Sequence, residues 1–131
     1  MSQIFENNLE KIIFNWIDNV LIKKIPDDVV AFCFNLYDDG NYNWSMEIVG
    51  TESFDAEDAD WACDEITDFD TRTNPLSWID KVEWKDVLKK VTLILEKYIE
   101  KGKFSNILNS VNGVAVGFVD GDINIIYKGV K

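Results

Sequence analysis

The spacing of apolar residues predicts two amphipathic helices separated by strands. Residues 3–22 place an apolar side chain at every third or fourth position, which is the period of one helical face. Residues 80–101 repeat this pattern with lysines on the outer positions, and we expect Trp84 on the buried face. The stripe of the first helix is expected to comprise Phe5, Leu9, Ile12, Ile13, Trp16, Ile17, Val20 and Leu21.

A first hairpin is predicted between the two helices. Residues 29–37 are apolar on both faces over most of their length, which is typical of a central strand. Residues 38–41 then form a turn in which Gly40 supplies positive φ, and residues 42–49 return as a second strand. Alternation predicts that Trp44, Met46 and Ile48 share one face of this second strand.

A second hairpin is predicted after the second helix. Residues 114–119 and 123–127 are strands joined by the turn Asp120-Gly121-Asp122. The resulting order, α-β-β-(β)-α-β-β, predicts an α+β fold with helices packed on a mostly antiparallel sheet. At 131 residues, the chain is expected to form one domain, residues 1–131.

Residues 52–70, named here the acidic stretch, interrupt this regular pattern. They hold nine carboxylates and no base, so they carry −9 of the chain's formal charge of −11. Their periodicity fits both a strand and a helix over residues 61–69. We favour a loop through residues 52–60 followed by a third strand over residues 61–69, because β-branched and aromatic residues occur there. The helical alternative stays open.

Composition excludes several classes of function. The acidic balance argues against nucleic acid as a partner, and Arg72 is the only arginine. No apolar run is long enough to span a bilayer, and the first residues do not read as a signal peptide, so we expect a cytoplasmic protein. Cys33 and Cys63 lie in apolar contexts and are expected to be buried free thiols, with a disulfide as the alternative.

No residue pattern predicts a catalytic or metal centre. The chain has no histidine, which excludes His-based triads and metal sites, and it has no glycine-rich phosphate loop. Residues 68–73 and 120–124 both depart from the ligand order of a calcium loop, and the second is expected to be a plain turn. We therefore expect a protein that is not an enzyme and that needs no cofactor.

Concentrated carboxylates beside an aromatic side chain favour a binding surface for a basic protein. Trp61 would be an anchor if it were exposed, because binding energy concentrates in tryptophan. The alternative is a solvated acidic loop with Trp61 turned into the core. The predicted partner-binding residues are Glu57, Asp58, Asp60, Trp61, Asp64, Glu65 and Asp68.

Two segments also carry a resemblance to a group of known proteins. Residues 54–65 (FDAEDADWACDE) and 114–127 (VAVGFVDGDINIIY), with the helix between them, resemble small acidic bacterial immunity proteins of polymorphic toxin and contact-dependent inhibition systems. The resemblance implies stoichiometric binding of a cognate toxin domain, often a basic nuclease, and occlusion of its active site. Two other classes stay open: a small-molecule or cation-binding module, and a structural or assembly protein.

Overall fold

The computed structural model describes residues 2–129, and it describes side chains from residue 8 onward. The helices are α1 (Ser2–Leu21), α2 (Trp84–Lys101), α3 (Ser105–Leu108) and the 3-10 helix η1 (Ala59–Cys63). The strands are β1 (Ala31–Gly40), β2 (Asn43–Thr51), β3 (Glu65–Thr67), β4 (Leu76–Ile79), β5 (Gly113–Phe118) and β6 (Asn124–Lys128). Both predicted helices and both predicted hairpins are confirmed, with boundaries shifted by a few residues.

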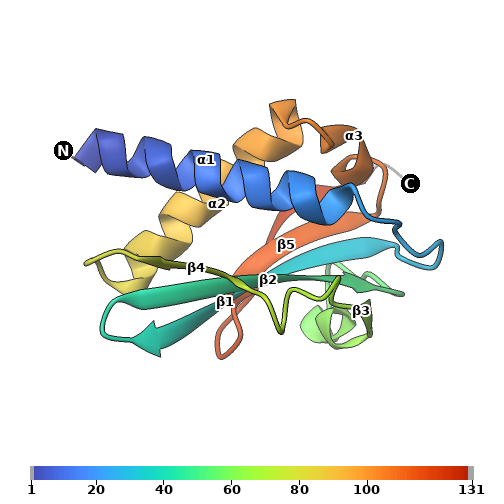
Figure 1. Ribbon diagram of the computed structural model, residues 1–131. Helices are drawn as coiled ribbons and strands as arrows, with labels where there is room; N and C mark the ends of the chain where they lie inside the picture. The colour runs from blue at the N-terminus through green and yellow to red at the C-terminus, as the bar shows by residue number, and fades with distance from the viewer. Residues whose placement is uncertain (1, 130–131) are drawn as a thin grey trace.

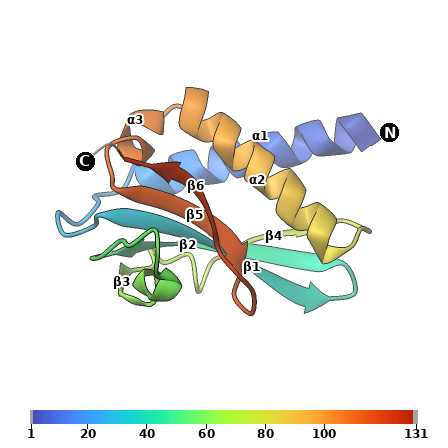
Figure 2. The same ribbon diagram turned by 180° about the vertical axis from the view of Figure 1, so that it is seen from behind.

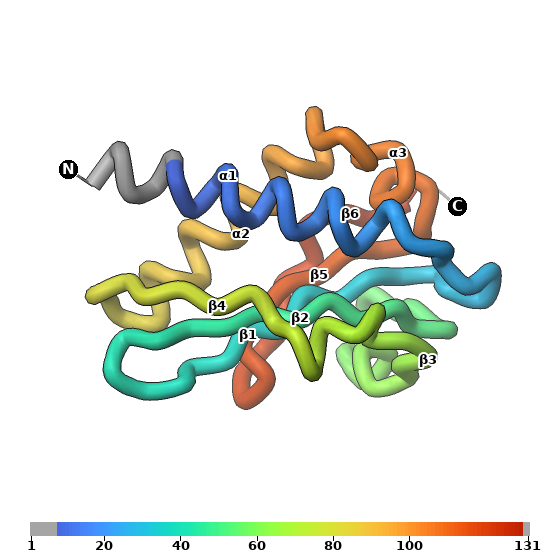
Figure 3. Tube along the Cα trace, in the orientation of Figure 1, coloured from blue at the N-terminus to red at the C-terminus, as the bar shows by residue number. Residues whose placement is uncertain are grey.

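The six strands form one sheet in the order β3-β2-β1-β5-β6, and β4 pairs with β2 beside β3. Within residues 2–129, the central β1–β5 pairing is parallel and the other four strand pairs are antiparallel. The predicted α+β class with a mostly antiparallel sheet is therefore confirmed. Figure 3 shows that the chain leaves β2, runs through the acidic stretch and returns as β4, which pairs with β2.

Helices α1 and α2 cross over one face of the sheet (Figure 1). Most of the α1 stripe is buried as the period predicts, while Trp16 is half-buried and Ile12 is exposed. Phe5 lies outside the described side chains. Alternate residues of the strands face these helices and form the main core. Its sheet residues include Phe32, Phe34, Leu36, Trp44, Met46, Ile48, Val114 and Val116.

Tyr98 joins the two helices to the following turn. Its hydroxyl donates to Asp18 Oδ1 at 2.6 Å and accepts from the Phe104 N–H at 3.1 Å. Burial, and secondarily the Asp18 carboxylate, raises the pKa of this hydroxyl. The Tyr98 ring lies against Gly102, where a Cβ would overlap it, so the residue after α2 must be glycine.

Three local predictions are wrong. The polar residues 71–77, which contain Pro75, predict a plain connection, but residues 76–79 pair with β2 as β4. The turn of the first hairpin lies at residues 40–43 rather than 38–41, because Asn41 and Tyr42 both adopt positive φ. Trp84, which the helical stripe predicts to be buried, is 49% exposed in the first turn of α2, where it packs edge to face on Phe118.

Candidate functional site

The acidic stretch lies on the face of the sheet opposite the helices. After β2 the chain turns across that face, forms η1 and then adds β3 to the edge of β2 (Figures 1 and 2). The Glu52 N–H donates to the Asp64 carbonyl at 3.1 Å, which closes residues 52–64 into a loop with adjoining ends. This loop is therefore a defined surface feature and has a fixed place on the sheet.

Two aromatic side chains hold this loop against the sheet. Trp61 is buried with Ala31, Cys33, Val49 and Ala115 in a second hydrophobic cluster, and Phe54 packs beside it. The two aromatic rings meet edge to face, with centroids 5.0 Å apart. β5 begins with Gly113 beneath the Phe54 ring, and a Cβ at this position would overlap that ring. Phe54 can therefore pack this closely only against glycine.

The interpretation of Trp61 as an exposed anchor is wrong. Its side chain is only 3% exposed, so the alternative in which Trp61 turns into the core is confirmed. The predicted third strand over residues 61–69 is also wrong in its first half, because η1 extends to Cys63 and β3 covers only Glu65–Thr67. The tight 3-10 turn is what directs the indole toward the sheet.

Several carboxylates of the acidic stretch have local structural roles. Asp55, Asp58 and Asp68 each accept a hydrogen bond of 2.9–3.0 Å from the backbone N–H two residues further on. Such bonds stabilise turns, and the one from Asp58 caps the start of η1. Asp64 accepts a short hydrogen bond from the Ser53 hydroxyl. Much of the acidity therefore serves to shape the loop.

Glu65 is neutralised by Arg72, which also reaches a second carboxylate. The guanidinium donates to Glu65 Oε1 at 2.6 Å and to Glu47 Oε1 at 2.9 Å. Glu47 lies on β2, is only 1% exposed, and also accepts from Asn35 Nδ2 at 2.8 Å. These residues form a charged network on the face opposite the helices.

The network keeps the buried Glu47 carboxylate ionised. Burial alone would raise the pKa of Glu47, but the hydrogen bonds from Arg72 and Asn35 outweigh it and lower that pKa below its usual value. The bonds to Glu65 and Glu47 raise the pKa of the Arg72 guanidinium. Sequence reasoning missed this network, although a lone arginine directly after an unbroken acidic run was an available signal.

The structure thus divides the predicted site residues. Four carboxylates are exposed on the closed loop and η1, whereas Glu65 is paired with Arg72 and Asp68 is half-buried beyond β3. Glu57 and Asp60 accept no hydrogen bond from the described part of the protein, so their carboxylates face solvent. We name the exposed group the acidic loop, and it comprises Glu57, Asp58, Asp60 and Asp64.

The two cysteines have different environments. Both are free thiols, but Cys33 is buried and Cys63 is exposed at the end of η1, so the prediction that both are buried is wrong for Cys63. Burial, then the nearby Glu47 carboxylate, raises the pKa of Cys33 to about 12. The Cys33 thiol donates to Asn35 Oδ1 at 3.3 Å.

Over residues 2–129, no group of three or more cysteine or carboxylate side chains is placed to hold a metal ion. Within the same range, no helix has the length and apolar character needed to cross a bilayer.

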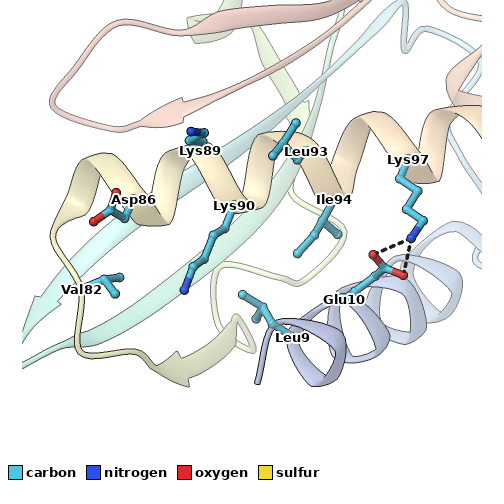
Figure 4. Close-up of a pocket in the computed structure, with 9 residues that line it drawn as sticks. All are labelled: Leu9, Glu10, Val82, Asp86, Lys89, Lys90, Leu93, Ile94 and Lys97. Carbon is cyan, nitrogen blue, oxygen red and sulfur yellow. Dashed lines mark hydrogen bonds and ion pairs between the residues drawn. The ribbon is translucent and has the colours of Figure 1, made fainter. Parts of the chain in front are cut away.

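A groove lies between α1 and α2, away from the acidic stretch (Figure 4). It has a volume of about 630 Å³ and an apolar floor that includes Leu9 and Ile94. Its charged groups are largely paired: Lys97 contacts Glu10 at 3.0 Å, and Lys90 contacts Asp80 at 2.9 Å. Size alone therefore does not make this groove the site.

Comparisons with protein-family models, with curated proteins and with solved structures gave no match.

Proposed function

We propose that this chain is a protein-binding module that captures a basic protein domain through the acidic loop. By the resemblance noted above, the partner would be a toxin, which the chain neutralises as an immunity protein does, by covering its active site. One observation carries the proposal: four exposed carboxylates sit on a closed loop that Phe54 and Trp61 fix to the sheet.

The distribution of charge supports this proposal. No lysine or arginine occurs between residues 52 and 71, whereas α2, on the opposite face of the sheet, carries five lysines against three carboxylates. The two faces therefore differ in charge, and the acidic one would attract and orient a basic domain during encounter. Attraction of this kind raises the association rate and weakens with added salt.

The rigidity of the loop also supports it. Flexible segments lose conformational entropy when a partner orders them, and this loss lowers affinity. Here the loop is already ordered by its aromatic anchors, by the Asp58 cap and by the contact between Glu52 and Asp64. The carboxylates of the acidic loop can therefore meet a partner without that loss.

The test reverses the charges of Glu57 and Asp60, whose carboxylates accept no hydrogen bond from the described part of the protein. In the variant carrying Glu57→Lys and Asp60→Lys, Asp58 is kept because it caps η1. The partner to be tested is the product of the neighbouring gene. We expect its association to slow about tenfold at roughly 20 mM salt, measured by stopped-flow fluorescence. At roughly 300 mM salt the difference in association rate between the variant and wild type should largely vanish, because the Debye length is then shorter than the separation of the charges during encounter.

The matched control places the same four-unit charge change on the helical face, as Glu96→Lys with Glu100→Lys. Both of these side chains are exposed on α2. Equal slowing in the two double variants would show that only net charge matters and would contradict the assignment to the acidic loop. The toxin part of the proposal fails if cells that produce the domain grow equally well with and without this chain.

A further inference from the structure

At the other end of the sheet, the β1–β2 turn lies near the start of α2 (Figures 1 and 2). A second groove opens there. Its volume is about 510 Å³. It lies away from the acidic loop, which follows the opposite end of β2, so it shares no residue with the site already described. We name it the hairpin groove, and it is lined by Asp38, Gly40, Asn41, Tyr42, Trp44, Val82, Glu83 and Trp84.

Tyr42 occupies this groove in an unfavourable backbone conformation. Asn41 and Tyr42 have φ of 52° and 62°, the signs of a type I′ turn, whose second central residue is usually glycine. A bulky side chain is disfavoured at positive φ. Tyr42 is 51% exposed, so core packing does not account for its presence there. Strain of this kind is concentrated at functional positions.

Trp84 is the second exposed aromatic residue of the groove. It is 49% exposed, yet its position is fixed because it packs edge to face on Phe118, with ring centroids 5.9 Å apart. Phe118 in turn packs on Trp44, whose indole N–H donates to the Asp80 carbonyl at 2.9 Å. The Trp84 ring is therefore held on a rigid support while half of it faces solvent.

The charge of the groove indicates which ligand these rings would take. Asp38 and Glu83 line it, no base does, and neither carboxylate forms an ion pair within the described residues. Lys85 does not line the groove, but its ammonium lies 5.7 Å from the centre of the Trp84 ring, so this ring already attracts a cation. Aromatic faces beside carboxylates are the surroundings that bind a guanidinium group.

We propose that the hairpin groove binds an arginine side chain of a basic protein partner. The guanidinium stacks on Tyr42 or Trp84 and donates hydrogen bonds to Asp38 and Glu83. Arginine fits better than lysine, because its planar group can stack and donate to a carboxylate at once. The inference rests on the proposed function for the class of partner, but it assigns different residues, so the two can be tested separately.

The test uses a blocked tripeptide, acetyl-Gly-Arg-Gly-amide, titrated into the ¹⁵N-labelled protein and followed by NMR. We expect saturable shifts of the Trp84 indole N–H and of the Tyr42 amide. The same peptide with citrulline, which is isosteric but neutral, should bind at least about fivefold more weakly, because it lacks the cation. Non-saturable shifts, equal affinity for citrulline, or shifts confined to residues 52–70 would overturn the proposal.

Variants of the groove sharpen the test. Trp84→Ala and Asp38→Asn should each weaken the arginine peptide about fivefold. Leu93→Ala, which removes another exposed side chain of α2 outside this groove, should leave its affinity unchanged. Tyr42→Gly should weaken the peptide while raising the melting temperature, since it relieves the strained turn. A Tyr42→Gly variant that keeps full affinity and is no more stable would contradict the role given to that strain.

The outcome separates this inference from the proposed function. If the Glu57→Lys and Asp60→Lys variant no longer binds the basic domain while Trp84→Ala binds it normally, the result supports the acidic loop as the binding site and contradicts the hairpin groove. If the arginine peptide binds at Trp84 and charge reversal in the acidic loop leaves the association rate with the basic domain unchanged, the result supports the hairpin groove and contradicts the acidic loop.

Discussion

The two faces of the sheet are built in different ways. The face under α1 and α2 is continuous and apolar, with Phe32, Phe34 and Leu36 fully buried. The opposite face has a small cluster around Trp61 and, beside it, the charged network of Glu47 and Arg72. Apolar burial stabilises the first face, whereas a loop and one ion-pair network cover the second. The stability of the second face therefore depends on a few specific side chains, and its exposed residues can be substituted at little cost to the free energy of unfolding.

The largest expected effect compares one large side chain from each face. Phe34→Ala should lower the free energy of unfolding by about 4 kcal/mol, because it leaves a cavity in the main core. Trp61→Ala should cost about 3 kcal/mol, and the loss should come mainly from freeing the acidic stretch. Denaturant unfolding gives the totals. Hydrogen exchange should show faster opening confined to residues 52–64 in Trp61→Ala, and opening throughout the sheet would contradict the contrast between the faces.

The next effect concerns the charged network. Arg72→Ala leaves Glu47 buried without its cation and should cost about 3 kcal/mol, at the lower end for broken buried pairs because the Arg72 side chain is half exposed. Arg72→Lys cannot serve both carboxylates with a forked group and should recover only part of this loss. Urea unfolding at neutral pH measures both variants, and equal stability of wild type and Arg72→Ala would contradict the role of the network.

The smallest effect is a dependence on pH. The pKa of Glu47 is lower in the folded protein than its usual value of 4.5, so its ionisation stabilises the fold above that pH. This contribution is lost as the pH falls through 4.5 toward the folded pKa. We expect Glu47→Gln to be less stable than wild type at pH 7 and to converge with it in acid. Parallel stability curves between pH 7 and pH 3 would contradict this assignment.

Sequence pattern predicted the helical face well and the opposite face poorly. The stripe of α1 and the alternation along β2 are local periodicities, and burial against a layer of helices preserves them. The orientation of Trp61 depends instead on contact with Ala31 and Ala115, which are distant in sequence. The same alternation puts Glu47 on the opposite face of β2 from Met46 and Ile48, as the structure shows, but its burial depends on Arg72, twenty-five residues later. Such contacts leave no periodic trace.

The candidate site shows the same division. Composition alone located the acidic stretch in the sequence. Glu57 and Asp60 are exposed, as a charged surface requires. Composition did not separate carboxylates that shape turns, such as Asp68, from those that face solvent, because both have the same side chain. The sequence pattern also placed Trp84 in the core, since a helical stripe does not reveal how much of each side chain its neighbours cover.

The unequal cysteines give the protein a selective attachment point for a probe. The Cys33 thiol is buried, and its pKa of about 12 leaves almost no thiolate at neutral pH, so maleimide reagents should not modify it in the folded state. Cys63 is exposed between Trp61 and the β3 strand, within the acidic stretch. The natural chain can thus carry one fluorophore or spin label at that position without any substitution, and its signal would report directly on a partner arriving there.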